Sequence, residues 1–289
     1  MNYNKANIIA EIGCNHKGDI QIAKELIYLA KQCNVDVAKF QKRNNKELLP
    51  ESQYNSPHPN PINSYGDTYG DHREFLEFSQ NQHQELKEYS ESIGIKYSTS
   101  VWDVASAKEI SELNPELIKV PSASNTHYKM LEVLRDEYKG EVHVSFGMTT
   151  KSEQEKLVNF FEDKDQAKNR LIIYSCTSGY PVPFPDVCLL EILDVKKRFE
   201  NRVKSIGFSG HHLGIAIDVA AYTLGVTWIE RHFTKDRTWK GTDHSASLEP
   251  AGLAKLSRDL KATFEALNYK EKEILDIEAI QREKLKFSK

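Results

Sequence analysis

The feature that most constrains this chain is a regular alternation of strand-like and helix-like stretches. Eight short runs rich in β-branched and other apolar residues have strand character, at 6–13, 36–41, 95–101, 117–122, 141–147, 170–177, 204–210 and 227–234. Eight stretches with helix character alternate with them, at 19–33, 80–93, 103–113, 127–138, 151–163, 186–199, 214–224 and 250–267. Such alternation implies parallel strands joined by helical crossovers, and eight units predict a closed (β/α)8 TIM barrel. An open doubly wound sheet is the alternative, but no Gly-x-Gly-x-x-Gly motif follows the first strand.

Two segments do not follow the alternation. Residues 42–79 carry two neighbouring asparagines, three prolines at 57–61 and two glycines, and so long an irregular stretch in a compact domain is usually functional. We therefore predict a barrel domain over 1–267 in which 42–79 is a long active-site loop. Residues 268–289 are rich in Lys and Glu with spaced Ile and Leu, which predicts a charged C-terminal extension, either a helix or a linker.

The composition describes a globular protein that binds neither nucleic acid nor membranes. Of 289 residues, 39% are hydrophobic and 28% charged, and the net charge of −3 leaves no positive surplus for an anionic polymer or surface. We find no apolar run long enough for a membrane-spanning helix and no signal peptide at the N-terminus. The four cysteines lack metal-site spacing and fit reduced thiols, so we expect a cytoplasmic protein.

Two predicted strands of one βαβ unit carry histidines at their ends. The first is followed by His211 and His212, and the second contains Glu230 and His232. The carboxyl ends of barrel strands form the face where ligands bind, so His211 and His232 are candidate metal ligands. The alternative is that these histidines cap a strand or are hydrogen-bonded in the core.

Two lysines lie inside predicted strands, where an unpaired ammonium group is costly. Lys39 and Lys119 are suited to bind a phosphate and a carboxylate together with hydroxyl groups from other strand ends, namely those of Thr99, Ser122, Ser145 and Ser178. One alternative is a Schiff-base lysine, as in TIM-barrel aldolases. Another is a structural ion pair inside the barrel, for example Lys39 with Glu11.

An ordered set of motifs runs from about residue 7 to residue 267. Its pieces are Ile9-Ala-Glu-Ile-Gly-Cys-Asn-His16, Lys39-Phe-Gln41, Lys119-Val-Pro-Ser122, Ser145-Phe-Gly-Met148, Cys176-Thr-Ser-Gly-Tyr-Pro181, Gly207-Phe-Ser-Gly-His211, Glu230-Arg-His-Phe-Thr234 and Gly241-Thr-Asp-His-Ser-Ala-Ser-Leu-Glu-Pro250. The set is specific as a whole, and it resembles the sialic acid synthase (N-acetylneuraminate synthase) family.

The resemblance implies condensation of phosphoenolpyruvate with an N-acylated amino-sugar aldehyde, giving a nonulosonic (sialic-acid-like) acid and phosphate. It implies a divalent metal, commonly Mn²⁺ with Mg²⁺ or Co²⁺ as alternatives, held by His211 and His232 and polarising the aldehyde. Glu11 would be the acid/base group near carbon 2, and Glu230 would orient the metal ligands or hold a water at the metal. The other matched positions are expected to bind phosphoenolpyruvate (Lys39, Thr99, Lys119, Ser122, Ser145, Ser178) and the sugar (Gln41, Tyr180, Asp243).

Several positions depart from the family pattern. Gly210 stands where an Asp usually precedes the first metal histidine, His212 replaces a Thr, and Ser124 replaces a Glu. Ser178 and Phe146 replace an Asn and a Thr. These changes favour one alternative, a barrel that binds phosphoenolpyruvate without synthase activity; a Schiff-base aldolase is the other.

Family members usually carry a C-terminal antifreeze-like (SAF) domain, which sends an arginine into the partner's active site. This sequence stops where the linker to that domain would begin. We expect a homodimer whose 42–79 loop covers the barrel mouth, with Arg73 as a candidate for the arginine. A separate SAF-domain protein is the alternative source.

Overall fold

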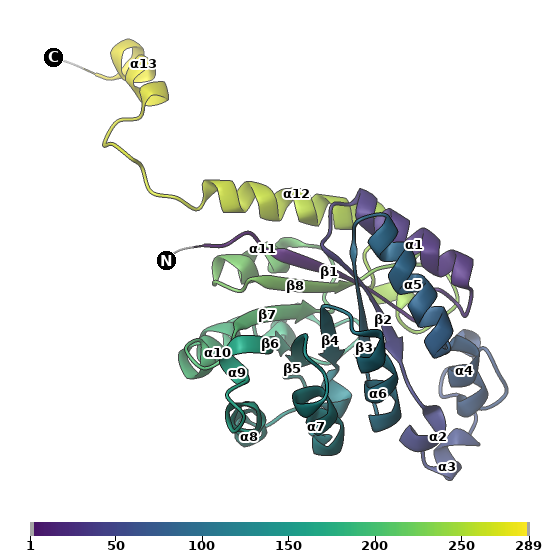
Figure 1. The fold of residues 1–289 in the computed structure, drawn as a ribbon. Coiled ribbons are helices and arrows are strands. Elements are labelled where there is room, and N and C mark those ends of the chain that lie inside the picture. The colour runs from purple at the N-terminus through teal and green to yellow at the C-terminus, as the bar shows by residue number, and fades with distance from the viewer. Residues whose placement is uncertain (1–2, 288–289) are drawn as a thin grey trace.

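The computed structural model describes residues 3–287, and within them eight parallel strands close into a barrel (Figure 1). Each strand pairs in parallel with the next, and β8 pairs with β1. The predicted TIM barrel is therefore confirmed. The strands are β1 (Asn7–Gly13), β2 (Val37–Lys42), β3 (Lys96–Val101), β4 (Leu117–Val120), β5 (Glu141–Ser145), β6 (Leu171–Cys176), β7 (Ser205–Gly210) and β8 (Trp228–His232).

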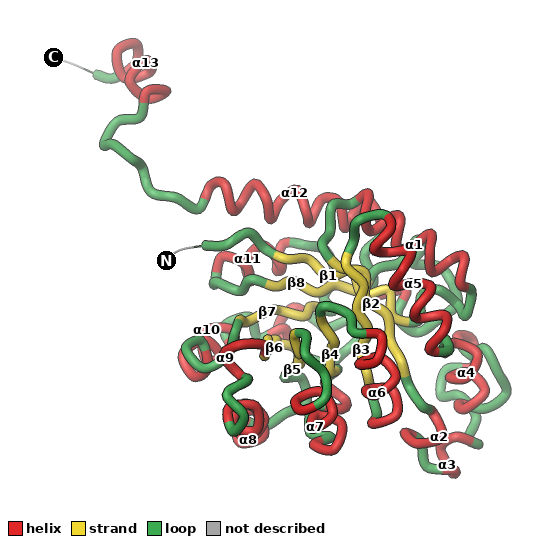
Figure 2. Tube along the Cα trace, in the orientation of Figure 1, coloured by secondary structure: helices red, strands yellow, loops and turns green. Residues whose placement is uncertain are grey.

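Helices lie around the strands on the outside of the barrel (Figure 2). They are α1 (Ile20–Gln32), α5 (Gln80–Ser92), α6 (Val104–Leu113), α7 (Tyr128–Asp136), α8 (Lys151–Glu162), α9 (Ala167–Arg170), α10 (Glu191–Phe199), α11 (Ala216–Thr223) and α12 (Pro250–Ala266). The side chains of Asp19 and Asp103 cap α1 and α6 by accepting hydrogen bonds from backbone N–H groups of the first turn.

Some boundaries differ from the prediction, for local backbone reasons. Strand β4 ends before Pro121, which has no N–H group to continue the ladder. The helix predicted over 186–199 is two elements, because Cys188 adopts a left-handed conformation (φ 49°) between the short 3₁₀ helix η3 (Phe184–Val187) and α10. Two further 3₁₀ turns, η2 (Ser122–Ser124) and η4 (His244–Ala246), follow β4 and β8.

Apolar packing forms two layers. Between strands and helices lies the larger core, and the barrel interior holds a smaller cluster of Ile9, Val37, Leu117, Ile172, Tyr174 and Trp228. His143 closes this interior cluster, since its ring packs edge-on against Trp228 and its Nδ1 lies 2.7 Å from the Tyr174 hydroxyl. This part of the barrel interior is therefore filled, and the cavity described below opens toward the carboxyl ends of the strands.

The segment after β2 is more ordered than the predicted loop. It contains α2 (Asn45–Leu48), α3 (Glu51–Tyr54), the 3₁₀ turn η1 (Pro61–Asn63) and α4 (Tyr69–Leu76). All but α4 are too short to show a periodic apolar pattern, and α4 is held by a capping box between Thr68 and Asp71.

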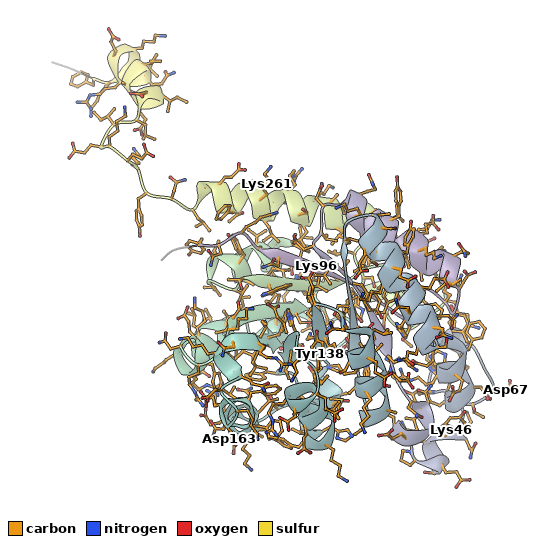
Figure 3. The ribbon with its side chains drawn as sticks, in the orientation of Figure 1. Lys46, Asp67, Lys96, Tyr138, Asp163 and Lys261 are labelled. Atoms are coloured by element: carbon orange, nitrogen blue, oxygen red, sulfur yellow. The ribbon has the colours of Figure 1, made fainter. Side chains whose placement is uncertain are left out.

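This segment reaches across to the loop that follows β8. The Tyr65 hydroxyl donates to the Lys240 carbonyl, and the Lys240 ammonium lies 5.0 Å from the centre of the Tyr65 ring. The backbone N–H of Gly241 donates to Asn63 Oδ1 at 3.3 Å. The labelled Lys46 and Asp67 mark the segment at one side of the barrel in Figure 3.

Beyond α12 the chain leaves the barrel. An extended stretch leads to α13 (Asp276–Leu285), which stands clear of the other elements (Figures 1 and 2). Its side chains project into open space around the helix (Figure 3), and no residue of it is buried. Across residues 3–287 we find no helix with the length and apolarity needed to cross a membrane.

Candidate active site

The carboxyl ends of the strands open into one cavity of about 400 Å³. Strand register sets its floor, because Glu11 on β1 lies opposite Lys39 on β2 and His232 on β8. The predicted site residues that line the cavity are Glu11, Lys39, Gln41, Lys119, Ser122, Ser145, Ser178, Tyr180, His211, Glu230, His232 and Asp243.

Two lysines and two glutamates meet at the cavity floor. The Lys39 ammonium is paired with Glu11, lies 3.6 Å from Glu230 Oε2 and donates to Ser100 Oγ at 2.6 Å. Lys119 donates to Glu230 Oε1 at 2.8 Å. The structural ion pair considered from the sequence is therefore present, and it is half of a four-residue cluster whose charges balance.

The electrostatics of the cluster follow from burial and pairing. Burial disfavours the charged form of Glu230, but the charges of Lys119 and Lys39 and hydrogen bonds from Lys119 and Ser209 outweigh it and hold its pKa well below the ordinary value. Burial lowers the pKa of Lys119, against the opposing effect of Glu230. The Lys119 ammonium also lies 4.3 Å from the centre of the Tyr174 ring.

The structure corrects the prediction for Thr99. Its hydroxyl lies 2.5 Å from that of Tyr97, which in turn lies 2.7 Å from His83 of α5, so Thr99 points to the helix layer. Side chains alternate along a strand, and the β3 hydroxyl that reaches Lys39 is that of Ser100.

Two hydroxyl groups converge at the ends of β4 and β6. A Cβ atom placed on Gly147 would collide with the hydroxyls of Ser122 and Ser178, so the lack of a side chain at 147 lets the two serines approach. Both serines, with Ser145, line the cavity beside Lys119. Ammonium and hydroxyl donors together form a site suited to a phosphate or carboxylate.

The two predicted metal ligands lie side by side. The ring centres of His211 and His232 are 5.4 Å apart, and the ring of Tyr180 lies 4.4 Å from the first and 5.7 Å from the second. His211 Nδ1 is 3.1 Å from the Thr177 carbonyl, which can only accept, so Nδ1 carries the proton and Nε2 keeps its lone pair. Burial and the neighbouring His232 lower the pKa of His211 to about 3, which keeps the imidazole neutral.

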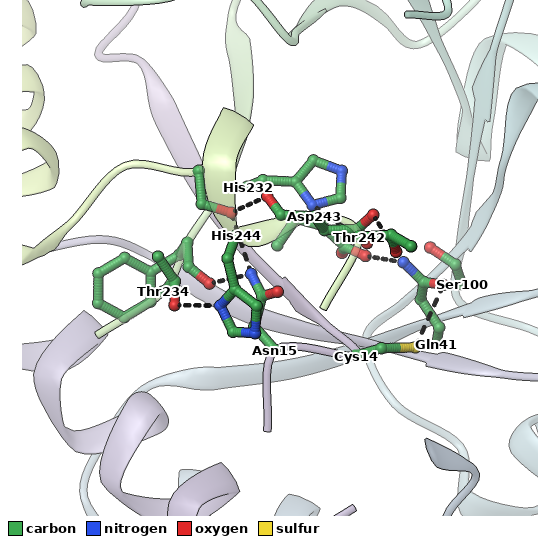
Figure 4. Close-up of polar contacts among 12 residues, drawn as sticks. Cys14, Asn15, Gln41, Ser100, His232, Thr234, Thr242, Asp243 and His244 are labelled. Atoms are coloured by element: carbon green, nitrogen blue, oxygen red, sulfur yellow. Dashed lines mark hydrogen bonds and ion pairs between the residues drawn. The ribbon is translucent and has the colours of Figure 1, made fainter. Parts of the chain in front are cut away.

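His232 has a ring nitrogen without a hydrogen-bond partner. Its Nδ1 is buried, and the nearest carboxylate oxygen, Oδ2 of Asp243, lies 3.9 Å away (Figure 4). The free nitrogens of the two imidazoles fit a divalent metal. Among residues 3–287 no group of three or more His, Cys, Asp or Glu side chains forms a metal site, and His211 and His232 stay the two predicted ligands.

His212, which follows the predicted metal ligand His211, faces away from the cavity. It is fully buried, and its Nε2 lies 3.1 Å from Nη1 of Arg231, which also pairs with Asp218. A Cβ atom at Gly210 would come within 2.8 Å of the His212 ring, so the glycine makes room for this histidine. The two departures from the family pattern thus belong to one packing arrangement.

The sugar-side candidates Gln41, Tyr180 and Asp243 all line the cavity. Gln41 Nε2 donates to Glu11 Oε1 at 2.8 Å, and its Oε1 accepts from Arg43 (the surroundings of Gln41 are drawn in Figure 4). Ser124, in contrast, donates to the Trp102 carbonyl at 2.9 Å and does not line the cavity. The contact that a family Glu would make at that position is therefore absent.

Comparison with known proteins decides the family. A sequence profile of the NeuB family matches residues 26–272. The chain belongs to the NeuB family. Human N-acetylneuraminate-9-phosphate synthase is 40% identical over 283 residues, which cover 96% of this chain and 76% of the human protein. N,N'-diacetyllegionaminic acid synthase of Campylobacter jejuni is 30% identical over 263 residues, covering 91% of this chain and 78% of that protein.

A solved structure shows the same fold. The crystal structure of N-acetylneuraminic acid (sialic acid) synthetase from Leptospira borgpetersenii, in complex with citrate, matches with a TM-score of 0.81 and 29% identity, over 97% of this chain and 91% of that one. The family predicted from the motifs, and with it the class of sugar acid synthase, is confirmed.

Sequence reasoning missed several residues that line the cavity of this NeuB-family chain. Arg43 and Trp102 were not singled out, and His72 and Arg73 were named only as part of the loop expected to cover the barrel mouth. Arg43 had a readable signal: it continues the alternation of Lys39 and Gln41, so its side chain falls on the same face of the chain. No such pattern marks His72 or Arg73, because α4 reaches the cavity only through tertiary packing.

Proposed function

We propose that this chain condenses phosphoenolpyruvate with an N-acylated amino-sugar aldehyde to form a nonulosonic acid and inorganic phosphate. The observation that carries the proposal is the shared cavity, which joins a buried lysine–glutamate cluster to the imidazole pair of His211 and His232. A small anion with a carboxylate and a phosphate group fits the two ammonium groups and the neighbouring hydroxyls, and a metal-assisted carbonyl fits the two histidines.

In the proposed reaction, carbon 3 of phosphoenolpyruvate forms a bond to the aldehyde carbon of the sugar. Water adds at carbon 2, and phosphate leaves as the bond between carbon 2 and the phosphate oxygen breaks. Phosphoenolpyruvate, sugar and one water thus give the acid and phosphate. Lys39 and Lys119 bind the carboxylate and phosphate groups, with Ser122, Ser145 and Ser178 donating from the strand ends.

Glu11 holds the position for proton transfer at carbon 2. Its carboxylate is fixed by Lys39 on one side and by Gln41 on the other, and it lines the cavity. A positioned carboxylate can take a proton from the attacking water. In this proposal Glu230 is chiefly the counter-ion of the two lysines rather than a group at the metal, since its oxygens bond Lys119 and Ser209.

His211 and His232 are the residues that would hold the divalent metal, Mn²⁺ or alternatively Mg²⁺ or Co²⁺. When bound, the ion supplies a Lewis acid for the aldehyde oxygen. Gln41, Tyr180 and Asp243 orient the sugar, and Tyr180 does so from its place against both imidazole rings.

The names of the relatives differ on one property of the sugar. The human protein is named for a 9-phosphate product and the Campylobacter jejuni protein for an acid without phosphate. Three carbons come from phosphoenolpyruvate and six from a hexosamine, so a phosphate on carbon 9 of the acid derives from carbon 6 of the sugar.

Phosphate release tests the proposed reaction. With phosphoenolpyruvate, Mn²⁺ and a panel of N-acetylmannosamine-like and diacetamido sugars, with and without a 6-phosphate, we expect release that depends on at least one sugar. Folded protein that binds phosphoenolpyruvate tightly in calorimetry, but releases no phosphate with any sugar, would instead be the binding module.

A Schiff-base aldolase is the second candidate, and the lowered pKa of the buried Lys119 favours it. Borohydride reduction in the presence of substrate would trap an adduct on Lys39 or Lys119. The proposed reaction predicts no adduct, because both ammonium groups are held by carboxylates.

The proposal includes a homodimer in the cytoplasm, where phosphoenolpyruvate is made. Helix α13 exposes Ile277 and Leu285 (73% and 77%), with acidic residues in its first turn and basic residues in its last. Antiparallel packing of α13 on a second copy would cover the apolar residues and place opposite charges together.

We expect light scattering to give the mass of a dimer. Leu285→Lys should shift the protein toward monomer, because it puts a charge into the paired apolar surface. The matched control is Leu190→Lys, which changes an equally exposed leucine (70%) on the barrel and should leave the mass unchanged. An unchanged mass for both variants would exclude α13 as the interface.

A further inference from the structure

One end of the cavity is formed by cationic residues that the phosphoenolpyruvate site does not need. Arg43 and Arg73 both line it, the first just after β2 and the second from α4. The lysines and serines at the barrel floor already match the two anionic groups of phosphoenolpyruvate. The presence of these two arginines at the cavity therefore needs a separate explanation.

The two arginines are held in different ways. The charge of Arg43 is balanced, since its Nη1 lies 3.1 Å from Glu77 Oε1 and its guanidinium lies 4.3 Å from the centre of the Trp102 ring. Arg73 bonds the Tyr69 hydroxyl, at 3.0 Å from Nε, and lies 5.0 Å from the centre of that ring. Within residues 3–287 no carboxylate lies at ion-pair distance from Arg73, so no ion pair holds its charge at the cavity wall.

Among residues 3–287, no side chain near Arg73 forms an ion pair with it. His72 is buried and accepts a hydrogen bond from the Tyr65 backbone N–H at 3.1 Å, and burial with the nearby His58, Arg73 and Arg43 lowers its pKa to about 4. Asp243 is close enough to Arg73 to feel its charge but forms no ion pair with it, and its carboxylate lies 3.9 Å from His232 Nδ1. This end of the cavity thus presents a neutral imidazole beside a positioned guanidinium.

We infer that the amino sugar carries a phosphate group, bound by Arg73 at the end of the cavity formed by α4; this inference rests on the proposed synthase function. An uncharged sugar would leave the guanidinium without an anion, whereas a phosphate matches its planar set of donors. The aldehyde carbon and carbon 6 are the two ends of an open-chain hexosamine. A phosphate on carbon 6 therefore belongs on a different element from the histidines, which lie on β8 and just after β7.

Parallel kinetics with N-acetylmannosamine 6-phosphate and N-acetylmannosamine test the inference. We expect kcat/KM to be about 10- to 100-fold higher for the phosphorylated sugar, as for a gained hydrogen bond between charged groups. Arg73→Ala should lower kcat/KM for the phosphorylated sugar by about that factor. It should leave kcat/KM for the uncharged sugar within about twofold of the native value and leave the KM of phosphoenolpyruvate unchanged. Arg73→Lys should recover part of the loss.

Controls separate this inference from the proposed function. Lys240→Ala removes a nearby cation that does not line the cavity, and it should leave kcat/KM unchanged for both sugars. If Arg73→Ala does not fold, Arg73→Gln keeps a donor for Tyr69 and takes its place.

The outcomes distinguish the inference from the synthase function. Equal kcat/KM for both sugars, or an equal loss of kcat/KM for both in Arg73→Ala, overturns the inference while the synthase function stands. Absence of phosphate release with either sugar overturns the synthase function itself. If Arg73→Ala has the same kcat/KM as the native protein for both sugars, the inference is also overturned. That result would indicate an arginine from a separate SAF-domain protein.

Discussion

Lys39→Met is expected to lower the free energy of unfolding by about 3–5 kcal/mol and to reduce kcat/KM by about 10²- to 10³-fold. The structural reason is that Lys39 neutralises Glu11 at a position where both side chains are buried (2% and 4% exposed). Removing the ammonium leaves the Glu11 carboxylate with Gln41 as its remaining donor. A buried carboxylate without a cation is costly.

The stability and activity effects of Lys39 can be separated by a second substitution. Lys39→Met with Glu11→Gln replaces the ion pair by uncharged groups of similar size, so thermal unfolding should return close to that of the native protein. Activity should stay lost, because both the anion-binding ammonium and the proton-transfer carboxylate are gone. Recovery of phosphate release in the double variant would show that the pair is structural and not part of the reaction.

His232→Ala is expected to abolish binding of the divalent metal and to reduce phosphate release by about 10³-fold or more, because the Lewis acid contributes several kcal/mol to the transition state. The barrel should stay folded, since His232 Nδ1 has no hydrogen-bond partner to lose. The direct measurement is the metal content of the purified variant by mass spectrometry.

EDTA treatment of the native protein should abolish activity, and Mn²⁺, Co²⁺ or Mg²⁺ should restore it to different degrees.

The matched control for His232→Ala is His212→Ala. His212 is also a histidine after a barrel strand, but it contacts Arg231 and Asp218 behind the cavity. The His212→Ala variant should keep its metal content. It is expected to unfold at a lower temperature, because the substitution disturbs a buried polar network. Full activity of metal-free native enzyme would remove the metal from the mechanism, and loss of metal in both variants would show that the effect is not specific to the cavity.

The sequence by itself determined the architecture and the chemical character of the site. Strand and helix periods are local properties, so eight alternating units were enough to predict the barrel. Polar residues inside apolar strands, such as Lys39, Lys119 and His232, were visible because their burial conflicts with their chemistry. The barrel topology then brings the strand ends together, whatever their separation along the chain.

Only the tertiary structure decided which of these side chains meet. Thr99 and Ser100 are neighbours on β3, yet the pleat sends the first to the helices and the second to Lys39. His211 and His212 are likewise adjacent, and packing against Arg231 removes the second from the cavity. Arg73 reaches the cavity because α4 folds back beside the barrel mouth, which no local pattern encodes. Side-chain direction and long-range packing depend on the whole fold, and for that reason the places of Arg43, Arg73 and Trp102 in the cavity wall came from the structure alone.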